Sequence, residues 1–144
     1  MQLSKRTQYG LRAMICFADA YEQGFLQTRE LSAREMLPAK FLESILAALV
    51  RGRFLVSRMG ASGGYRLARP PQDIILGEIV ARLEGKRLLD GQPLEAGERP
   101  GEIAVRIVES ELTEAVRGVL NSTTLAELAE RTSQQSPSGQ MYYI

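Results

Sequence analysis

The apolar residues near the start of the chain recur at the spacing of an α-helix. This pattern predicts a helix over residues 5–23, with Ser4 as its N-cap and Gly24 just past its end. The residues expected to face the core are Leu11, Met14, Ile15, Ala18 and Tyr21.

The next two apolar patterns are separated by a few residues and predict a helix-turn-helix. A short helix is expected over residues 29–34 with Thr28 as its N-cap, and a second over residues 38–51 with Pro38 at its first position. Apolar and polar residues of the second helix separate onto two sides. The side expected to be buried holds Leu42, Ile45, Leu46 and Leu49, and the other holds Lys40, Glu43, Ser44, Ala47 and Arg51.

A hairpin and a fourth helix are expected to follow. Two β-prone segments, residues 54–58 and 65–69, flank a turn that contains several glycines, and two prolines end the second segment. A helix is expected over residues 76–84. This order of elements is that of a winged helix-turn-helix, so the expected fold class is mainly α with a small β-hairpin wing.

The second half of the chain predicts a linker and a long helix. Glycine and proline are spread through residues 86–101, and the helix is expected over residues 102–120. Its apolar surface exceeds what one small neighbour covers, so a second copy of the chain is expected to cover it as a homodimer. A second apolar row is assigned to Ile103, Ile107, Val116 and Leu120. The row expected at the dimer interface is Ala104, Val108, Leu112, Ala115 and Val119.

These elements divide the chain into four parts. Thr124 opens a last short helix that is expected to end near Arg131. The expected parts are a winged helix-turn-helix DNA-binding domain (1–85), a linker (86–101), the dimerisation and terminal helices (102–132) and a flexible tail (133–144).

The composition excludes most catalytic chemistry. The 144 residues include one cysteine and no histidine, which rules out a disulfide within the chain, Cys₄ and Cys₂His₂ zinc sites and Ser-His-Asp catalysis. No apolar run approaches the ~20 residues that span a bilayer. We therefore expect a protein of the cytoplasm that is not an enzyme, has no metal site and does not bind a membrane. Cys16 is expected to act as a small buried hydrophobe.

The charge is distributed unevenly along the chain. Residues 1–90 hold 14 of the 18 Lys and Arg residues but only 9 of the 17 Asp and Glu residues. A basic front half indicates a polyanionic partner, whereas the acidic rear half is expected to stay away from it.

The polar side of the 38–51 helix and the wing are the candidate DNA contacts. A major groove about 12 Å wide admits one helix, whose N-terminal residues reach the base edges. In the wing, Arg58 and Arg66 flank a glycine turn that permits a close approach to the duplex. Taken singly, each feature is explained better without DNA, the helix residues as a solvated face and the wing as an ordinary hairpin. Their adjacency in the basic half favours DNA.

The sequence resembles a known family at several motifs taken in order. It is similar to the Rrf-two-type family of bacterial transcription regulators over roughly residues 1–132. The motifs are LSKRTQYGLRA (3–13), LPAKFLESIL (37–46), GGYRLARP (63–70), IILGEIV (74–80) and STTLAEL (122–128).

The resemblance implies a homodimer that binds a near-palindromic operator, most often as a repressor. By position it assigns the helix that begins at Pro38 and the wing at residues 58–66 to double-stranded DNA, with Ser4 and Lys5 near the phosphates. The expected DNA-contacting residues are Ser4, Lys5, Thr28, Ala39, Lys40, Phe41, Glu43, Ser44, Arg51, Arg58, Ser62, Gly63 and Arg66.

Two departures from the family pattern matter. Many members bind an iron–sulfur cluster through three cysteines in the segment that corresponds to residues 86–101, and none is present here, so no cofactor is expected. The resemblance then leaves a small molecule, a thiol modification or a partner protein as the signal. Met59 stands where the wing often carries an arginine. The alternative function is a winged-helix module that binds a protein and has no specific affinity for DNA.

Overall fold

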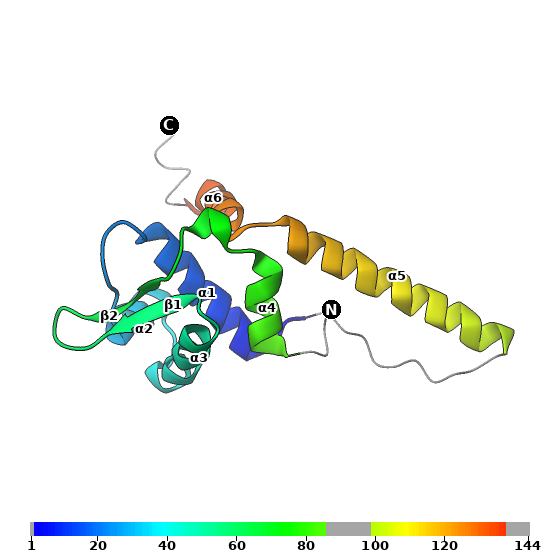
Figure 1. The fold of residues 1–144 in the computed structure, drawn as a ribbon, viewed down its shortest axis with the longest axis horizontal. Coiled ribbons are helices and arrows are strands. Elements are labelled where there is room, and N and C mark those ends of the chain that lie inside the picture. Colours follow the sequence, from blue (N-terminus) through cyan, green and yellow to red (C-terminus); the bar gives the residue numbers. More distant parts are fainter. Residues whose placement is uncertain (1, 86–98, 138–144) are drawn as a thin grey trace.

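The computed structural model describes residues 2–85 and 99–137. Five helices and a hairpin form one body, and the longest helix projects from it as an arm (Figure 1). The elements are α1 (Lys5–Asp19), α2 (Thr28–Glu35), α3 (Ala39–Arg51), β1 (Leu55–Arg58), β2 (Gly64–Leu67), the 3-10 helix η1 (Pro71–Asp73), α4 (Leu76–Glu84), α5 (Pro100–Ser122) and α6 (Leu125–Gln135).

Helix α1 begins as predicted but ends four residues earlier than expected. The Ser4 hydroxyl accepts a hydrogen bond from the Thr7 N–H at 3.2 Å, as an N-cap does. The predicted core-facing stripe is confirmed in part, because Met14 is fully buried and Leu11, Ile15, Ala18 and Tyr21 are half-buried and pack against the core. The buried side of α1 also includes Gly10, Ala13, Cys16 and Phe17, which the predicted stripe does not contain. The small residues were overlooked because they add little apolar area, yet they allow α4 to cross α1 closely.

The helix-turn-helix is formed by α2 and α3, each displaced by one residue from its expected start. Gln27, and not Thr28, is the N-cap of α2, and its N–H donates to Glu30 Oε1 at 3.2 Å. Pro38 is the N-cap of α3, and its carbonyl accepts the first hydrogen bonds of the helix. The predicted buried residues are confirmed, because Leu42, Ile45, Leu46 and Leu49 all lie in the core.

The wing is a hairpin that another part of the chain extends. Strands β1 and β2 pair antiparallel with Leu55 opposite Leu67 and Arg58 opposite Gly64. Leu26 pairs with Tyr65 on the other side of β2, by backbone hydrogen bonds of 2.9 and 2.8 Å. The segment between α1 and α2 is therefore attached to the wing by an isolated β-bridge.

The end of the chain returns to this body. Helix α4 has the predicted bounds, and the Leu125 N–H donates to the Ile74 carbonyl just before it at 2.8 Å. Helix α6 packs on α1 and η1, and Leu125 is fully buried in the core. The Thr124 hydroxyl caps α6 as predicted, but the helix continues to Gln135, beyond the expected end at residue 131. The predicted tail therefore begins within a helix, and residues 138–144 lie outside the described residues.

Helix α5 is longer than predicted at both ends. It begins at Pro100, whose fixed φ suits the first helical position, so Pro100 and Gly101 belong to the helix and not to a linker. Residues 86–98, the remainder of the predicted linker, lie outside the described residues. No residue of α5 is buried. None of the helices in the described ranges has the length and apolarity to cross a bilayer.

Candidate nucleic-acid interface

The exposed side of α3 gathers most of the residues predicted to read DNA. At about 100° of rotation per residue, Ala39, Lys40, Glu43, Ser44 and Arg51 fall on one side of the helix, and all are exposed. Arg51 stands about 16 Å along the axis from Lys40, so the two side chains lie near opposite ends of this side of α3. Phe41 is 61% exposed but lies about a third of a turn from the centre of this side.

The N-terminus of α1 lies against the same part of α3. Arg6 Nη1 donates to Ser44 Oγ at 3.2 Å, which connects the two helices at their exposed ends. Lys5 is exposed beside it. Sequence reasoning missed Arg6, although it is the second member of the basic pair that opens α1.

Glu84 fixes this end of α1 to the end of α4. Its Oε1 accepts a hydrogen bond from the Ser4 N–H at 2.6 Å. Burial raises the pKa of the Glu84 carboxyl, but hydrogen bonds from Ser4 and Thr7 lower it by more, so the net pKa lies below its ordinary value. The carboxylate therefore helps to place Ser4 and Lys5 beside α3.

The two predicted wing arginines share one aromatic support. The guanidinium carbon of Arg66 lies 4.7 Å from the centre of the Phe25 ring, and that of Arg58 lies 5.6 Å from it. Both distances are within the range of cation–π contacts, which hold a guanidinium by its flat face and leave its N–H groups directed outward. Sequence reasoning missed Phe25, because its partners depend on the pairing of Leu26 with the hairpin.

The wing tip is held from the same segment. Gln27 Nε2 donates to the carbonyl oxygen of Ala61 at 2.6 Å, and Thr28, which is half-buried, follows at the start of α2. Ser62 is exposed, as a DNA contact requires. Gly63 is different, because it is buried and a Cβ there would collide with the carbonyl oxygen of Arg58. We therefore reassign Gly63 from DNA contact to turn geometry.

The predicted interface row of α5 is exposed. Val108, Leu112 and Val119 are 55%, 58% and 64% exposed, and Ala104 and Ala115, on the same side of the helix, are exposed as well. The second row predicted for this helix is not a single row. Val116 and Leu120 are half-buried on the side that faces α4, where Gly77 closely approaches the last turn of α5. At about 100° of rotation per residue, the centre of the interface row lies roughly a quarter of a turn from Val116 and Leu120.

The comparisons with known proteins agree with this arrangement. The family model of Rrf2, described as an iron-dependent transcriptional regulator, matches residues 3–131. The chain belongs to the Rrf2 family. The HTH-type transcriptional regulator CymR of Bacillus subtilis is 33% identical over 144 residues, which is the full length of both chains. IscR of Serratia proteamaculans is 25% identical over 132 residues, 89% of this chain and 79% of that protein.

Two solved structures show the Rrf2 fold in this chain. The structure of CymR, titled the global cysteine regulator of B. subtilis, superposes with a TM-score of 0.82 at 32% identity and covers 92% of this chain and 98% of that one. The structure of T. potens IscR gives a TM-score of 0.79 at 30% identity, with coverage of 99% and 97%. The predicted fold, mainly α with a winged helix-turn-helix, is thereby confirmed. The chain is a transcriptional regulator, and the members of its family are regulators and not enzymes.

The residues of this Rrf2 protein do not fit an iron–sulfur cluster. Its one cysteine, Cys16, is 5% exposed and packs in the core of the body. Burial raises the pKa of the Cys16 thiol, which disfavours the thiolate that a metal needs. Within residues 2–85 and 99–137, no group of three or more His, Cys, Asp or Glu side chains is placed to hold a metal ion.

Proposed function

We propose that this chain is a homodimeric repressor that binds a near-palindromic operator. The observation that carries the proposal is the convergence of three basic elements around α3. Lys40 and Ser44 lie on α3, and the Arg6–Ser44 hydrogen bond joins α3 to the Lys5–Arg6 end of α1. The wing, which also packs on α3, carries Arg58 and Arg66 against Phe25.

The side chains on α3 are assigned to the major groove. Lys40 donates to guanine O6 and N7 or to a phosphate, Glu43 accepts from cytosine N4, and Ala39 contacts a thymine methyl group. Ser44 is held near the groove by Arg6.

The remaining cations and hydroxyls surround that helix and are assigned to the backbone and the minor groove. Arg58 and Arg66 are presented by Phe25 toward a minor groove or a phosphate. The residues assigned to phosphates are Ser4, Lys5, Thr28, Arg51 and Ser62.

The exposed row of α5 supports the homodimer. Isolated apolar side chains on a surface are ordinary, but a continuous row along a projecting helix marks an interface. A twofold axis would place the two copies of α3 one duplex turn apart, about 34–36 Å, or a multiple of it. The operator is therefore expected to contain two inverted half-sites.

The regulator is proposed to act without an iron–sulfur cluster, because one buried cysteine cannot supply the ligands. Its signal is then carried by a small molecule or a partner protein. As a chromosome-binding protein it is proposed to act in the cytoplasm. The chain is divided accordingly into the DNA-binding residues 1–85 and the dimerisation helix α5, with α6 packed on the former.

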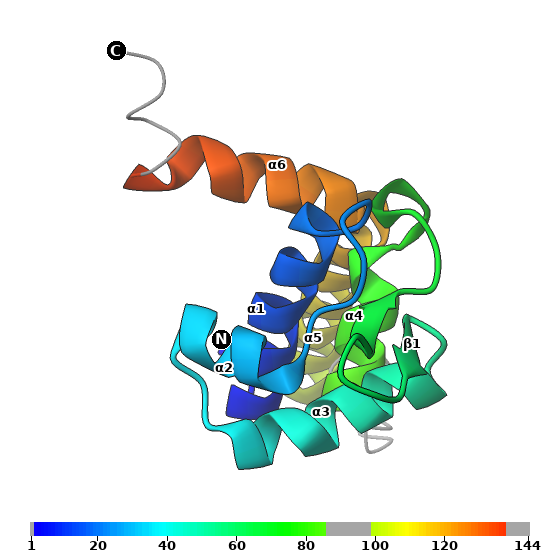
Figure 2. The same cartoon turned by 90° about the vertical axis from the view of Figure 1, so that its left-hand side faces the viewer.

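Fluorescence anisotropy with a labelled fragment of the promoter of its own gene tests the proposal. Affinity should fall steeply with salt, because phosphate contacts release counterions, and should be lower for scrambled DNA of equal length. Lys40→Ala should weaken binding by about 1–3 kcal/mol. The matched control is Arg131→Ala, an exposed cation on α6, which lies on the side of the body away from α3 (Figure 2). A flat salt response, or equal affinity for scrambled DNA, contradicts specific binding.

Two exposed apolar residues favour a second candidate, a protein-binding module. Phe41 is 61% exposed on α3 and Met59 is 96% exposed at the wing tip. Apolar anchors of this kind are typical of protein interfaces. The same titration discriminates between the two candidates, because a protein-binding module has no preference for the promoter sequence.

A further inference from the structure

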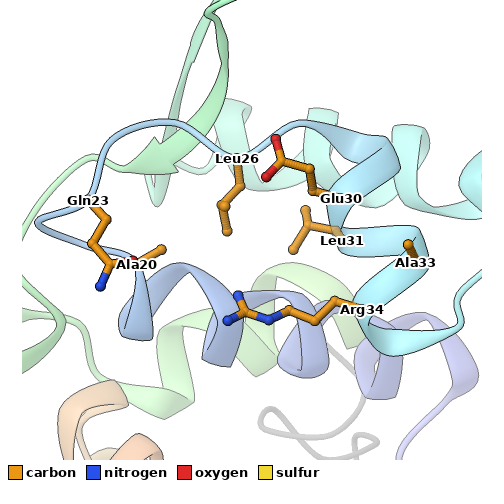
Figure 3. Close-up of a pocket in the computed structure, with 7 residues that line it drawn as sticks. All are labelled: Ala20, Gln23, Leu26, Glu30, Leu31, Ala33 and Arg34. Atoms are coloured by element: carbon orange, nitrogen blue, oxygen red, sulfur yellow. The ribbon is translucent and has the colours of Figure 1, made fainter.

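A hollow lies behind the helix-turn-helix, between the end of α1, the segment that leads to α2, and α2 itself. Its volume is about 500 Å³, within the range of about 300–1,000 Å³ that is usual for small-molecule sites. Figure 3 shows its apolar surface, to which Ala20, Leu26 and Leu31 contribute. The polar side chains at its edge are Gln23, Glu30 and Arg34.

The two charged groups of the hollow lie on either side of its apolar surface. In Figure 3 the Glu30 carboxylate lies near Leu26, and the Arg34 guanidinium extends along the opposite side toward Ala20. Within the described part of the chain, Arg34 forms no ion pair within 4.0 Å. Only one oxygen of Glu30 is engaged, by the Gln27 N–H. Each charged group therefore keeps hydrogen-bonding capacity for a ligand.

These charges favour a ligand that carries both signs. A simple anion would meet Arg34 but would also face the carboxylates of Glu30 and Asp19. Arg34 lowers the pKa of Asp19, although burial raises that pKa by more. A simple cation would meet Glu30 but would also lie near the positive charge of the Arg34 guanidinium. A guanidinium such as that of Arg34 binds a carboxylate with two parallel hydrogen bonds, and a carboxylate such as that of Glu30 accepts hydrogen bonds from an ammonium group.

We propose that the hollow binds a free amino acid with an apolar side chain and that this binding regulates the affinity for the operator. Arg34 holds the carboxylate of the amino acid, Glu30 its ammonium group, and Leu26 and Leu31 its side chain. The binding part stands by itself, whereas the regulatory part rests on the proposed function.

The segment that lines the hollow is also the segment that supports the wing. Leu26 contacts the hollow and pairs with Tyr65 of β2, while its neighbours Phe25 and Gln27 hold the wing arginines and the wing tip. Leu31 is buried in the core that α3 shares. A ligand that contacts both Leu26 and Leu31 therefore fixes the wing relative to α3. This ordering stabilises the DNA-binding arrangement, so the ligand acts as a corepressor.

Isothermal titration of the full chain with each standard amino acid in turn tests the binding part. At least one amino acid with an apolar side chain should bind, and Arg34→Met and Glu30→Gln should each weaken it by about tenfold or more, since each removes a charged hydrogen bond. Gln at position 30 still supports a capping box, so α2 is retained. Arg29→Met, an exposed cation of the same helix outside the hollow, is the control and should bind as the wild type does.

Analogues of the amino acid that binds test the requirement for both charges. With leucine as the example, leucinamide lacks the carboxylate and 4-methylpentanoate lacks the ammonium group, and both should bind at least about tenfold more weakly. Absence of binding by every amino acid, equal binding by either analogue, or unchanged binding to Arg34→Met overturns the site.

The regulatory part is tested by repeating the anisotropy titration at a saturating concentration of the amino acid. A severalfold rise in operator affinity, absent in Arg34→Met, is expected. An unchanged or lower affinity overturns the coupling and leaves the binding result intact. If the protein has no specific affinity for DNA at all, the proposed function fails, and the calorimetric titration still decides the site.

Discussion

Helices α3 and α5 both carry apolar residues at spacings of three and four, but their surroundings differ. On α3, Leu42, Leu46 and Leu49 are fully buried by the rest of the chain. On α5, Val108, Leu112 and Val119 are each more than half exposed. The two alanines of the same row are also exposed. Periodicity thus predicts where an apolar face lies, but it does not predict whether the covering surface comes from the same chain.

The difference has an energetic meaning. Burying one valine or leucine side chain is worth about 1.5–3 kcal/mol. The burial of the apolar row on α3 stabilises the folded chain, whereas the exposed row on α5 contributes this energy only in the proposed dimer. The two helices should therefore respond in different ways to the same kind of substitution.

The largest effect is expected in the core of the body. Leu46→Ala removes a fully buried side chain of α3 and should lower the free energy of unfolding by about 2–5 kcal/mol. Leu112→Ala, at a protein concentration below that of dimerisation, should lower it by less than about 1 kcal/mol. Urea unfolding followed by circular dichroism measures both. Equal losses at the two positions would contradict the comparison.

The next effect separates association from folding. Leu112→Glu places a charge in the exposed row and should convert the dimer to a monomer at micromolar concentration without unfolding it. Light scattering during size-exclusion chromatography measures the mass, and operator affinity should fall in parallel. The control is Ser110→Glu, which adds the same charge to a different side of α5. A Leu112→Glu protein that remains dimeric would show that this row is not the interface.

A smaller effect is expected in the wing, which is exposed like α5 but supported by its own chain. Phe25→Leu removes the ring beneath Arg58 and Arg66 and should weaken operator binding by about 1 kcal/mol. In the double variant with Arg66→Ala, the loss of binding free energy should be smaller than the sum of the losses in the two single variants, because both substitutions remove the same contact. Anisotropy measures each affinity. Full additivity would show that the ring does not position Arg66.

The smallest effect is expected at Glu84. A carboxylate with a lowered pKa stabilises the folded chain above its unfolded-state pKa, and this contribution is lost as the pH falls through its folded-state pKa. Glu84→Gln should therefore lower stability by about 1 kcal/mol or less at neutral pH, and the difference from wild type should shrink below about pH 4. Urea unfolding at several pH values measures it, with Glu130→Gln as an exposed control. A difference that grows with acidity would contradict the role of the Ser4 hydrogen bond.

Local patterns in the sequence were sufficient for much of the fold. The spacing of Leu42, Ile45, Leu46 and Leu49 identified the buried side of α3, and Gly85 marked the end of α4, because both signals lie within the element concerned. The order of helices and hairpin then identified the winged helix-turn-helix.

What escaped prediction depends on contacts between distant segments. The pairing of Leu26 with Tyr65 joins residues far apart in the sequence, so neither this β-bridge nor the Phe25 support has a local signal. Gly63 looked like a point of approach to DNA, but its burial follows from the turn between β1 and β2. Arg6 acquires its role only when α1 and α3 are brought together.

Gly77 has a geometric consequence for the proposed dimer. A Cβ at this position would meet the side-chain oxygen of Asn121 and would lie 3.2 Å from the carbonyl oxygen of Leu120, so the start of α4 packs closely on the end of α5. Helix α5 is about 35 Å long. A small change in its direction at this contact would therefore move its other end by a larger distance. A bulkier residue at position 77 would have to displace the Asn121 side chain and would crowd the Leu120 carbonyl oxygen. In the proposed dimer, any change in the direction of α5 that followed would alter the separation between the two copies of α3.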